Sequence, residues 1–80
     1  MKVNVIMPKQ GLQMEEGTIL KWTVREGETV NANQKIAEVE TDKTAIDIFA
    51  PVGGIITAIC FGAGTTVPVS ETIAVIENQL

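Results

Sequence analysis

The sequence predicts an all-β domain, either a two-sheet β-sandwich or a flattened barrel, and three observations support this prediction. Apolar and polar residues alternate over several short runs, which is the pattern of a half-buried strand. Val, Ile and Thr dominate these runs, and no long stretch has the apolar spacing of a helix. Turn-forming residues separate the runs, and the chain repeats itself once. About eight short strands in two equivalent halves favour two packed sheets.

The individual elements follow from local patterns. The alternating runs are Lys2–Met7, Leu20–Arg25 and, in weaker form, Ala45–Phe49. Turns are expected at residues 26–28, 31–33, 51–54 and 62–64, where Gly, Pro, Asn and acidic residues gather. The expected core consists of Val5, Ile19, Leu20, Trp22, Val24, Val30, Ile36, Val39, Ile56, Ile59, Phe61, Val67, Ile73 and either Val75 or Ile76.

An internal repeat divides the chain into two halves. A shift of 37 residues aligns Gly17–Lys43 with Gly54–Leu80 without a gap, and eight of the 27 pairs are identical, against roughly two expected by chance. Residues 5–8 correspond to residues 48–51 at a shift of 43, so the first half carries six extra residues within Lys9–Glu16. We therefore expect two similar sets of strands. We also expect that Gln10–Glu15 of the longer first-half loop can be replaced by a short Gly-containing turn without loss of the fold.

Composition excludes several classes of function. The chain of 80 residues has no histidine, no tyrosine and one cysteine, Cys60, so it cannot supply a Ser-His-Asp triad, a His/Cys zinc site, a CxxC redox pair or an internal disulfide. A net charge of −4 without a Lys/Arg cluster argues against nucleic-acid and membrane partners. We expect one non-catalytic, monomeric domain over residues 1–80, without a metal site and in the cytoplasm.

Lys43 stands out by its position between strand-like runs. Polar Thr41–Thr44 separates these runs and predicts a tight hairpin tip, because Asp suits turn chemistry. A primary amine at such a tip is accessible to an enzyme that acylates lysine. The alternative is a solvated surface charge that balances Glu40 and Asp42, which is the commoner role of a surface lysine.

Three stretches carry a resemblance to a known family. The segment Glu40-Thr41-Asp42-Lys43, followed by a strand and Ala50-Pro51-Val52-Gly53-Gly54, resembles the lipoyl attachment domain of the 2-oxo acid dehydrogenase complexes. The opening Met7-Pro8-Lys9, Gly11, Met14-Glu15-Glu16-Gly17-Thr18-Ile19 and Lys21-Trp22 is similar to the start of that domain in pyruvate and acetoin dehydrogenase acyltransferases. Glu26–Val30 matches the family's next turn, so the resemblance covers essentially the whole chain.

The resemblance implies a fold, a cofactor and a set of partners. The fold is a barrel-sandwich hybrid of two four-stranded antiparallel sheets related by a pseudo-twofold axis. The cofactor is lipoic acid, joined covalently to the ε-amine of Lys43 as a swinging arm that carries acyl groups and electrons. The partners are a lipoate ligase or lipoyl transferase, a thiamine-diphosphate 2-oxo acid decarboxylase, an acyltransferase core and a dihydrolipoyl dehydrogenase.

The resemblance also marks candidate recognition residues. Glu40, Asp42 and Thr44 flank the lysine and are expected to contribute to partner recognition, and Thr44 stands where the family most often has alanine. We further expect Glu38 and Asp47 to lie around the arm as contacts for basic patches on partners. The family's counterpart of the Lys9–Glu16 loop lies close to this hairpin and contributes to recognition.

Two other functions remain open at the level of sequence. A biotin carrier domain of a biotin-dependent carboxylase shares this fold, but its lysine usually lies between two methionines, whereas Lys43 lies between Asp42 and Thr44. A non-carrier β-domain that binds a protein partner with Lys43 unmodified is the second alternative.

Overall fold

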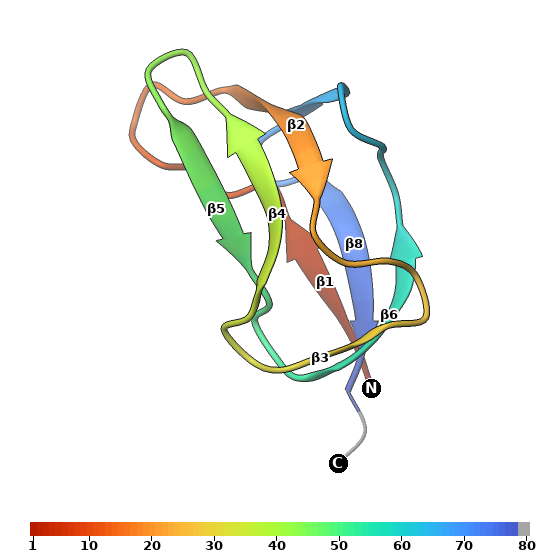
Figure 1. Ribbon diagram of the computed structural model, residues 1–80. Coiled ribbons are helices and arrows are strands. Elements are labelled where there is room, and N and C mark those ends of the chain that lie inside the picture. Colours follow the sequence, from red (N-terminus) through yellow and green to blue (C-terminus); the bar gives the residue numbers. More distant parts are fainter. Residues whose placement is uncertain (79–80) are drawn as a thin grey trace.

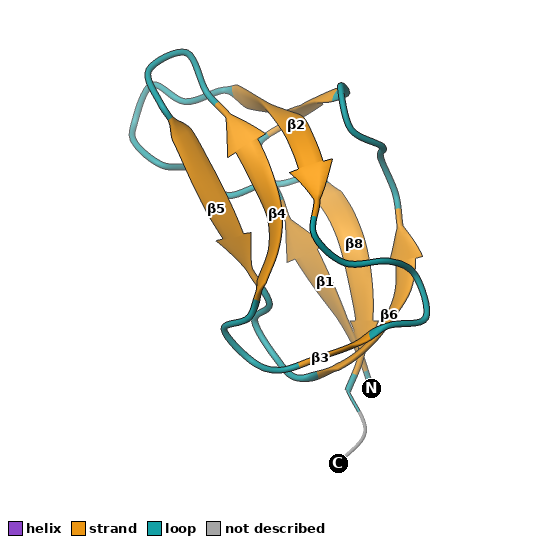
Figure 2. Ribbon diagram, viewed as in Figure 1, coloured by secondary structure: helices purple, strands orange, loops and turns teal. Residues whose placement is uncertain are grey.

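The computed structural model describes residues 1–78, which form eight strands in two four-stranded antiparallel sheets (Figure 1). The strands are β1 (Lys2–Ile6), β2 (Glu16–Trp22), β3 (Thr29–Val30), β4 (Lys35–Glu40), β5 (Ala45–Phe49), β6 (Gly54–Ile59), β7 (Thr66–Pro68) and β8 (Thr72–Glu77). One sheet has the order β1-β8-β6-β3 and the other β5-β4-β2-β7. The predicted all-β class is confirmed, and the two sheets pack as a sandwich that is not closed into a true barrel (Figure 2).

The two sheets have equivalent strand orders because the two halves of the chain share one plan. The 37-residue shift relates β2, β3 and β4 to β6, β7 and β8, and the 43-residue shift relates β1 to β5, so one sheet order maps onto the other. The register agrees as well, since Ile19 pairs with Val39 as Ile56 pairs with Ile76. Each half contributes two strands to each sheet, so neither half can complete a sheet alone. The predicted internal symmetry is confirmed.

The turns repeat in the same way. Gly27 and Gly64 both have φ of 90°, a conformation that glycine adopts without the steric penalty of a Cβ. The N–H of Gly27 donates to the carbonyl of Ile56 at 2.7 Å, and the N–H of Gly64 donates to the carbonyl of Ile19 at 2.6 Å. The glycines matched by the sequence repeat therefore occupy equivalent turns that connect one sheet to the other.

The core lies between the sheets and is entirely apolar among the described residues. Its buried side chains are Val5, Met7, Met14, Ile19, Val24, Val30, Ile36, Ala37, Val39, Ile48, Ala50, Ile56, Val67, Ile73, Ala74 and Ile76. Trp22, Ile59 and Phe61, which the sequence places inside, are only partly buried and pack against the margin of this core. Of the two candidates near the end of the chain, Ile76 is buried and Val75 is half-buried.

The prediction for Leu20 is wrong. Its side chain is 42% exposed, because the pairing of β2 with β4 is irregular between Ile19 and Lys21 and the alternation of inward and outward side chains is interrupted there. The pairing of β6 with β8 has the same irregularity at Thr57, the repeat partner of Leu20, whose side chain is also exposed. The outward position is therefore a property of both halves.

The first and last described residues meet at one end of the sandwich. The N–H of Asn78 donates to the carbonyl of Met1 at 2.8 Å, and the α-amine of Met1 pairs with Glu77 at 2.7 Å. The hairpin between β4 and β5 lies at the opposite end of the molecule, whose long dimension is 36 Å (Figure 1). Within residues 1–78 there is no helix long and apolar enough to cross a membrane.

Candidate functional site

The predicted hairpin tip is present and joins β4 to β5. Glu40 and Ala45 form the last strand pair, and the N–H of Thr41 donates to the carbonyl of Thr44 at 2.8 Å to close the turn. Asp42 and Lys43 occupy the tip, and both are exposed. The strands end here because the apolar alternation stops and short polar side chains satisfy the turn backbone.

The amine of Lys43 is available to an approaching enzyme. Its side chain is exposed, and among residues 1–78 it forms no ion pair or side-chain hydrogen bond. Lys21 and Lys35 differ, because both pair with the carboxylate of Glu38 on the face of a sheet. The hairpin therefore presents a primary amine beyond the ends of the strands.

The residues expected to contribute to recognition lie on the same hairpin as Lys43. Glu40, Asp42 and Thr44 are all exposed. Glu40 and Asp42 line a cleft of about 440 Å³ together with residues 13–18, which include the carboxylates of Glu15 and Glu16. The structure thus brings four acidic side chains to the end of the sandwich that carries Lys43.

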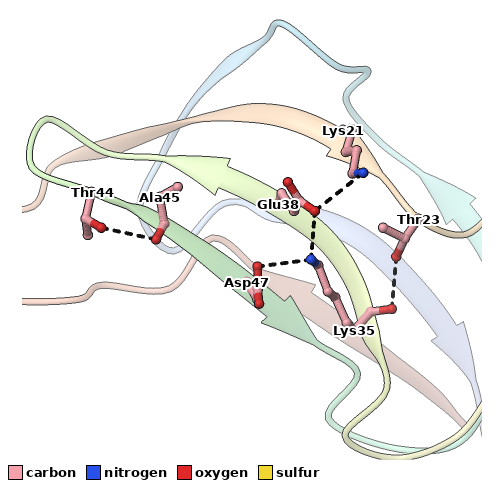
Figure 3. Close-up of polar contacts among 7 residues, drawn as sticks. All are labelled: Lys21, Thr23, Lys35, Glu38, Thr44, Ala45 and Asp47. Carbon is pink, nitrogen blue, oxygen red and sulfur yellow. Dashed lines mark hydrogen bonds and ion pairs between the residues drawn. The ribbon is translucent and has the colours of Figure 1, made fainter.

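Glu38 and Asp47 do not belong to this group, so the expectation that they lie around the arm is wrong. They are paired residues of β4 and β5 on the outer face of the sheet, and Lys35 bridges them at 2.7 Å and 3.3 Å (Figure 3). Lys21 lies 3.6 Å from the Glu38 carboxylate. The hydrogen bond with Lys35 holds the pKa of Glu38 below its ordinary value and raises the pKa of Lys35. This cluster offsets like-charge repulsion across the two strands.

The long first-half loop lies beside the hairpin. Residues 10–14 and Thr41–Thr44 together line a cleft of about 220 Å³, as expected for a loop near the lysine. The loop is anchored by Met14, whose side chain is only 8% exposed and whose sulfur accepts a hydrogen bond from the N–H of Gln10 at 3.3 Å. Leu12 lies at the outside of the loop and is 94% exposed. The expectation of a replaceable surface loop is therefore wrong at Met14, which is part of the core.

Two features of the site do not follow from the sequence patterns. One is the anchoring role of Met14, because the loop contains two large apolar residues, Leu12 and Met14, and no pattern indicates which of them is buried. The other is the hydroxyl of Thr41, which makes three hydrogen bonds to the backbone of the turn. Within the described part of the chain, no group of three or more His, Cys, Asp or Glu side chains is arranged to hold a metal ion. The chemistry that this end of the domain offers is thus an exposed amine on an ordered turn.

Comparisons with known proteins agree with this geometry. The family model described as "Biotin-requiring enzyme", which covers biotin and lipoyl attachment, matches residues 3–76. The chain is 42% identical over 80 residues to the dihydrolipoyllysine-residue acetyltransferase component of the pyruvate dehydrogenase complex of Rhizobium meliloti (strain 1021), covering 99% of the chain and 18% of that protein. It is 36% identical over 78 residues to the dihydrolipoyllysine-residue succinyltransferase component of the 2-oxoglutarate dehydrogenase complex of Rickettsia conorii (strain ATCC VR-613 / Malish 7), covering 98% of the chain and 20% of that protein. The chain therefore spans about a fifth of the length of these relatives.

A solved structure gives the same assignment. The solution structure of the lipoyl domain of the 2-oxoglutarate dehydrogenase complex from Azotobacter vinelandii superposes with a TM-score of 0.73 at 25% sequence identity, covering 92% of this chain and 96% of that one. This structural neighbour and the sequence relatives therefore point to the same kind of domain. The chain belongs to the biotin- and lipoyl-attachment family, and within it this is a lipoyl carrier domain, the class whose members hold lipoic acid covalently on a lysine.

Proposed function

We propose that Lys43 is the lysine that carries the lipoyl group, and that the domain acts as the swinging-arm carrier of a 2-oxo acid dehydrogenase complex. One observation carries this proposal. Lys43 lies at the tip of the β4–β5 hairpin, exposed and without an ion-pair partner in residues 1–78, at the end opposite the first and last described residues. The other four lysines lie in strands or, for Lys9, in the first-half loop.

The exposed amine at the tip of the hairpin is suited to covalent attachment of a lipoyl group. Amide formation needs the Lys43 Nζ to lose a proton and attack an activated lipoyl carboxyl, with AMP as the leaving group when ATP supplies the activation. The exposed tip gives a ligase access from several sides. The amide removes one positive charge, which takes the net charge from −4 to −5 and leaves Glu40 and Asp42 without a neighbouring cation at the tip.

The domain contributes display and tethering. A bound lipoyl group supplies reversible dithiol–disulfide chemistry and a thiol that carries the acyl group. The protein supplies a rigid two-sheet body that holds the attachment lysine clear of the core, and it has no catalytic role in this proposal. Tethering raises the local concentration of the arm at each partner without requiring tight binding. A small contact patch suits repeated short encounters.

The proposed partners follow from the complexes named for the relatives. These relatives include an acetyltransferase component, a succinyltransferase component and, at 42% identity over 77 residues, an E1 component subunit beta of pyruvate dehydrogenase from Rhizobium meliloti (strain 1021) that the chain covers by 17%. We take a modifying ligase or transferase, a thiamine-diphosphate decarboxylase, an acyltransferase core and dihydrolipoyl dehydrogenase as the partners. Glu40, Asp42 and Thr44 are the residues we expect them to contact, with complementary basic patches facing the two carboxylates.

Replacement of Lys43 by arginine tests the attachment site. Lys43→Arg retains the charge and removes the amine that can be acylated. Incubation with a lipoate ligase, lipoate and ATP should add one lipoyl group to wild type and none to Lys43→Arg, as measured by intact mass. Both proteins should give the same far-UV spectrum, because an exposed tip substitution changes stability by only about 0.5 kcal/mol.

Lys9→Arg is the matched control, since it makes the same change at another exposed lysine. This variant should gain one lipoyl group as wild type does. A lipoyl adduct on Lys43→Arg would contradict the assignment of the site. A biotin adduct on wild type isolated from cells would contradict the choice of cofactor.

A further inference from the structure

The hydroxyl of Thr41 organises the turn that displays Lys43. Its Oγ1 donates to the carbonyl of Thr44 at 2.8 Å and accepts from the N–H groups of Lys43 at 3.3 Å and Thr44 at 3.2 Å. The backbone adds one further bond across the turn, from the N–H of Thr41 to the carbonyl of Thr44 at 2.8 Å. A single side chain thus accounts for three of the contacts that fix the tip.

These contacts have no evident role in the core. Thr41 is half-buried, and the residues it holds, Asp42, Lys43 and Thr44, are all exposed. Without the hydroxyl, the N–H groups of Lys43 and Thr44 have only water as a partner. Ordering a turn of exposed residues is unfavourable in conformational entropy, so the tip would sample many conformations.

The other half of the molecule supports a role specific to this hairpin. The 37-residue repeat places Asn78 in the position equivalent to Thr41. The side chain of Asn78 donates to the carbonyl of Gly53 at 2.6 Å, away from the bond that its N–H makes to Met1. The backbone contact is therefore common to both ends of the sandwich, whereas the hydroxyl cap is found where the lysine is displayed.

We propose that Thr41 is a positioning residue for the modification of Lys43, because its hydroxyl holds the turn in the conformation that a lipoate ligase binds. This inference rests on the proposed function of Lys43. A ligase that binds one conformation of the tip has an apparent affinity reduced by the fraction of molecules in that conformation. Loss of the cap therefore raises the KM for the domain and leaves kcat unchanged.

Three variants test the proposal with purified ligase, lipoate and ATP. Thr41→Val removes the hydroxyl with little change in shape and should raise the KM for the domain about tenfold, as expected for the loss of about one net hydrogen bond. Thr41→Ser retains the hydroxyl and should restore the KM to within about twofold of wild type. Thr57→Val is the matched control, because Thr57 donates one hydrogen bond to Val75 on an exposed strand and its repeat partner is already apolar. It should behave as wild type.

Amide hydrogen exchange gives a readout that does not depend on modification. The N–H groups of Lys43 and Thr44 should exchange about tenfold faster in Thr41→Val than in wild type or Thr41→Ser, while strand amides keep their protection. If the wild-type domain is modified at Lys43 and the KM for Thr41→Val is the same as for wild type, the positioning role is overturned. Failure of wild type to gain a lipoyl group at Lys43 would instead overturn the proposed function.

Discussion

Replacement of Gly17 by alanine would test how tightly the end of the core beneath the hairpin is packed. Gly17 is buried in β2, and a Cβ at this position would lie 2.6 Å from Val39 Cγ1, 3.0 Å from Met7 Sδ and 3.3 Å from Met14 Cε. Carbon atoms in contact normally lie about 3.5–4.0 Å apart, so Val39 would have to move by about 1 Å. Val39 is fully buried and β-branched, and it has few alternative rotamers.

The magnitude follows from two opposing effects. Insertion of a methyl group into a packed core is unfavourable by about 1–3 kcal/mol. Alanine restricts the unfolded chain more than glycine does, which stabilises the folded state by about 0.4–1 kcal/mol. This gain applies here because the backbone of Gly17 is outside the positive-φ region. We therefore expect a net loss of about 1–2 kcal/mol, or about 4–16 °C in Tm for a domain of this size.

Urea denaturation and thermal melting, followed by circular dichroism, measure this loss. Gly62→Ala is the matched control, because Gly62 is exposed, has no positive φ and has no heavy atom within 4 Å of the position that the alanine methyl group would take. That control should retain or slightly exceed the wild-type free energy of unfolding. A Gly17→Ala protein as stable as the control would refute the argument that Val39 and the two methionines leave no room here.

Two further predictions concern the loop and the ion pairs. Replacement of Gln10–Gln13 by a shorter Gly-containing turn that keeps Met14 should leave Tm nearly unchanged. The same change should slow reductive acylation by the cognate decarboxylase, measured as the rate against the concentration of the domain. An unchanged rate would exclude recognition by the loop. For the ion pairs, Glu38 has a lowered pKa because of Lys35, so its contribution is present above its unfolded pKa and is lost as pH falls through the folded value. Lys35→Met should therefore lose less stability than wild type between pH 7 and pH 3 in urea titrations, and an equal loss would contradict this assignment.

The fold is predictable from the sequence where a backbone conformation requires a particular residue type. Gly27 and Gly64 occupy the same positive φ, so the repeated glycine locates equivalent turns from residue identity alone. Leu20 is wrongly assigned to the core because an irregularity in strand pairing interrupts the alternation of side chains there, and no particular residue type marks that irregularity in the sequence. Met14 is not assigned to the core because nothing in the loop sequence distinguishes it from the exposed Leu12, and its burial depends on packing against Gly17 of β2.

The site is predictable in part for a similar reason. A polar stretch between two strands identifies a hairpin, and a lysine at its tip is exposed by that geometry alone. Proximity in sequence is a poor guide to the charges. Glu38 and Asp47 lie close to the tip along the chain, but both pair with Lys35, Glu38 within β4 and Asp47 across from β5. The role of the Thr41 hydroxyl depends on a side-chain rotamer, which no pattern of residue types specifies.

The meeting of Met1 and Asn78 at one end of the sandwich has a mechanical consequence. The hydrogen bond from the N–H of Asn78 to the carbonyl of Met1 is the repeat equivalent of the bond from Thr41 to Thr44 that closes the lysine hairpin, and both measure 2.8 Å. The same structural position thus closes the lysine hairpin at one end and brings the first and last described residues together at the other. Any segment attached there would turn the body into a lever about 36 Å long, with its pivot at the joined end and Lys43 at the free end. Any rotation about that pivot would then move the lysine along an arc in proportion to this length, before any motion of the lysine side chain is added.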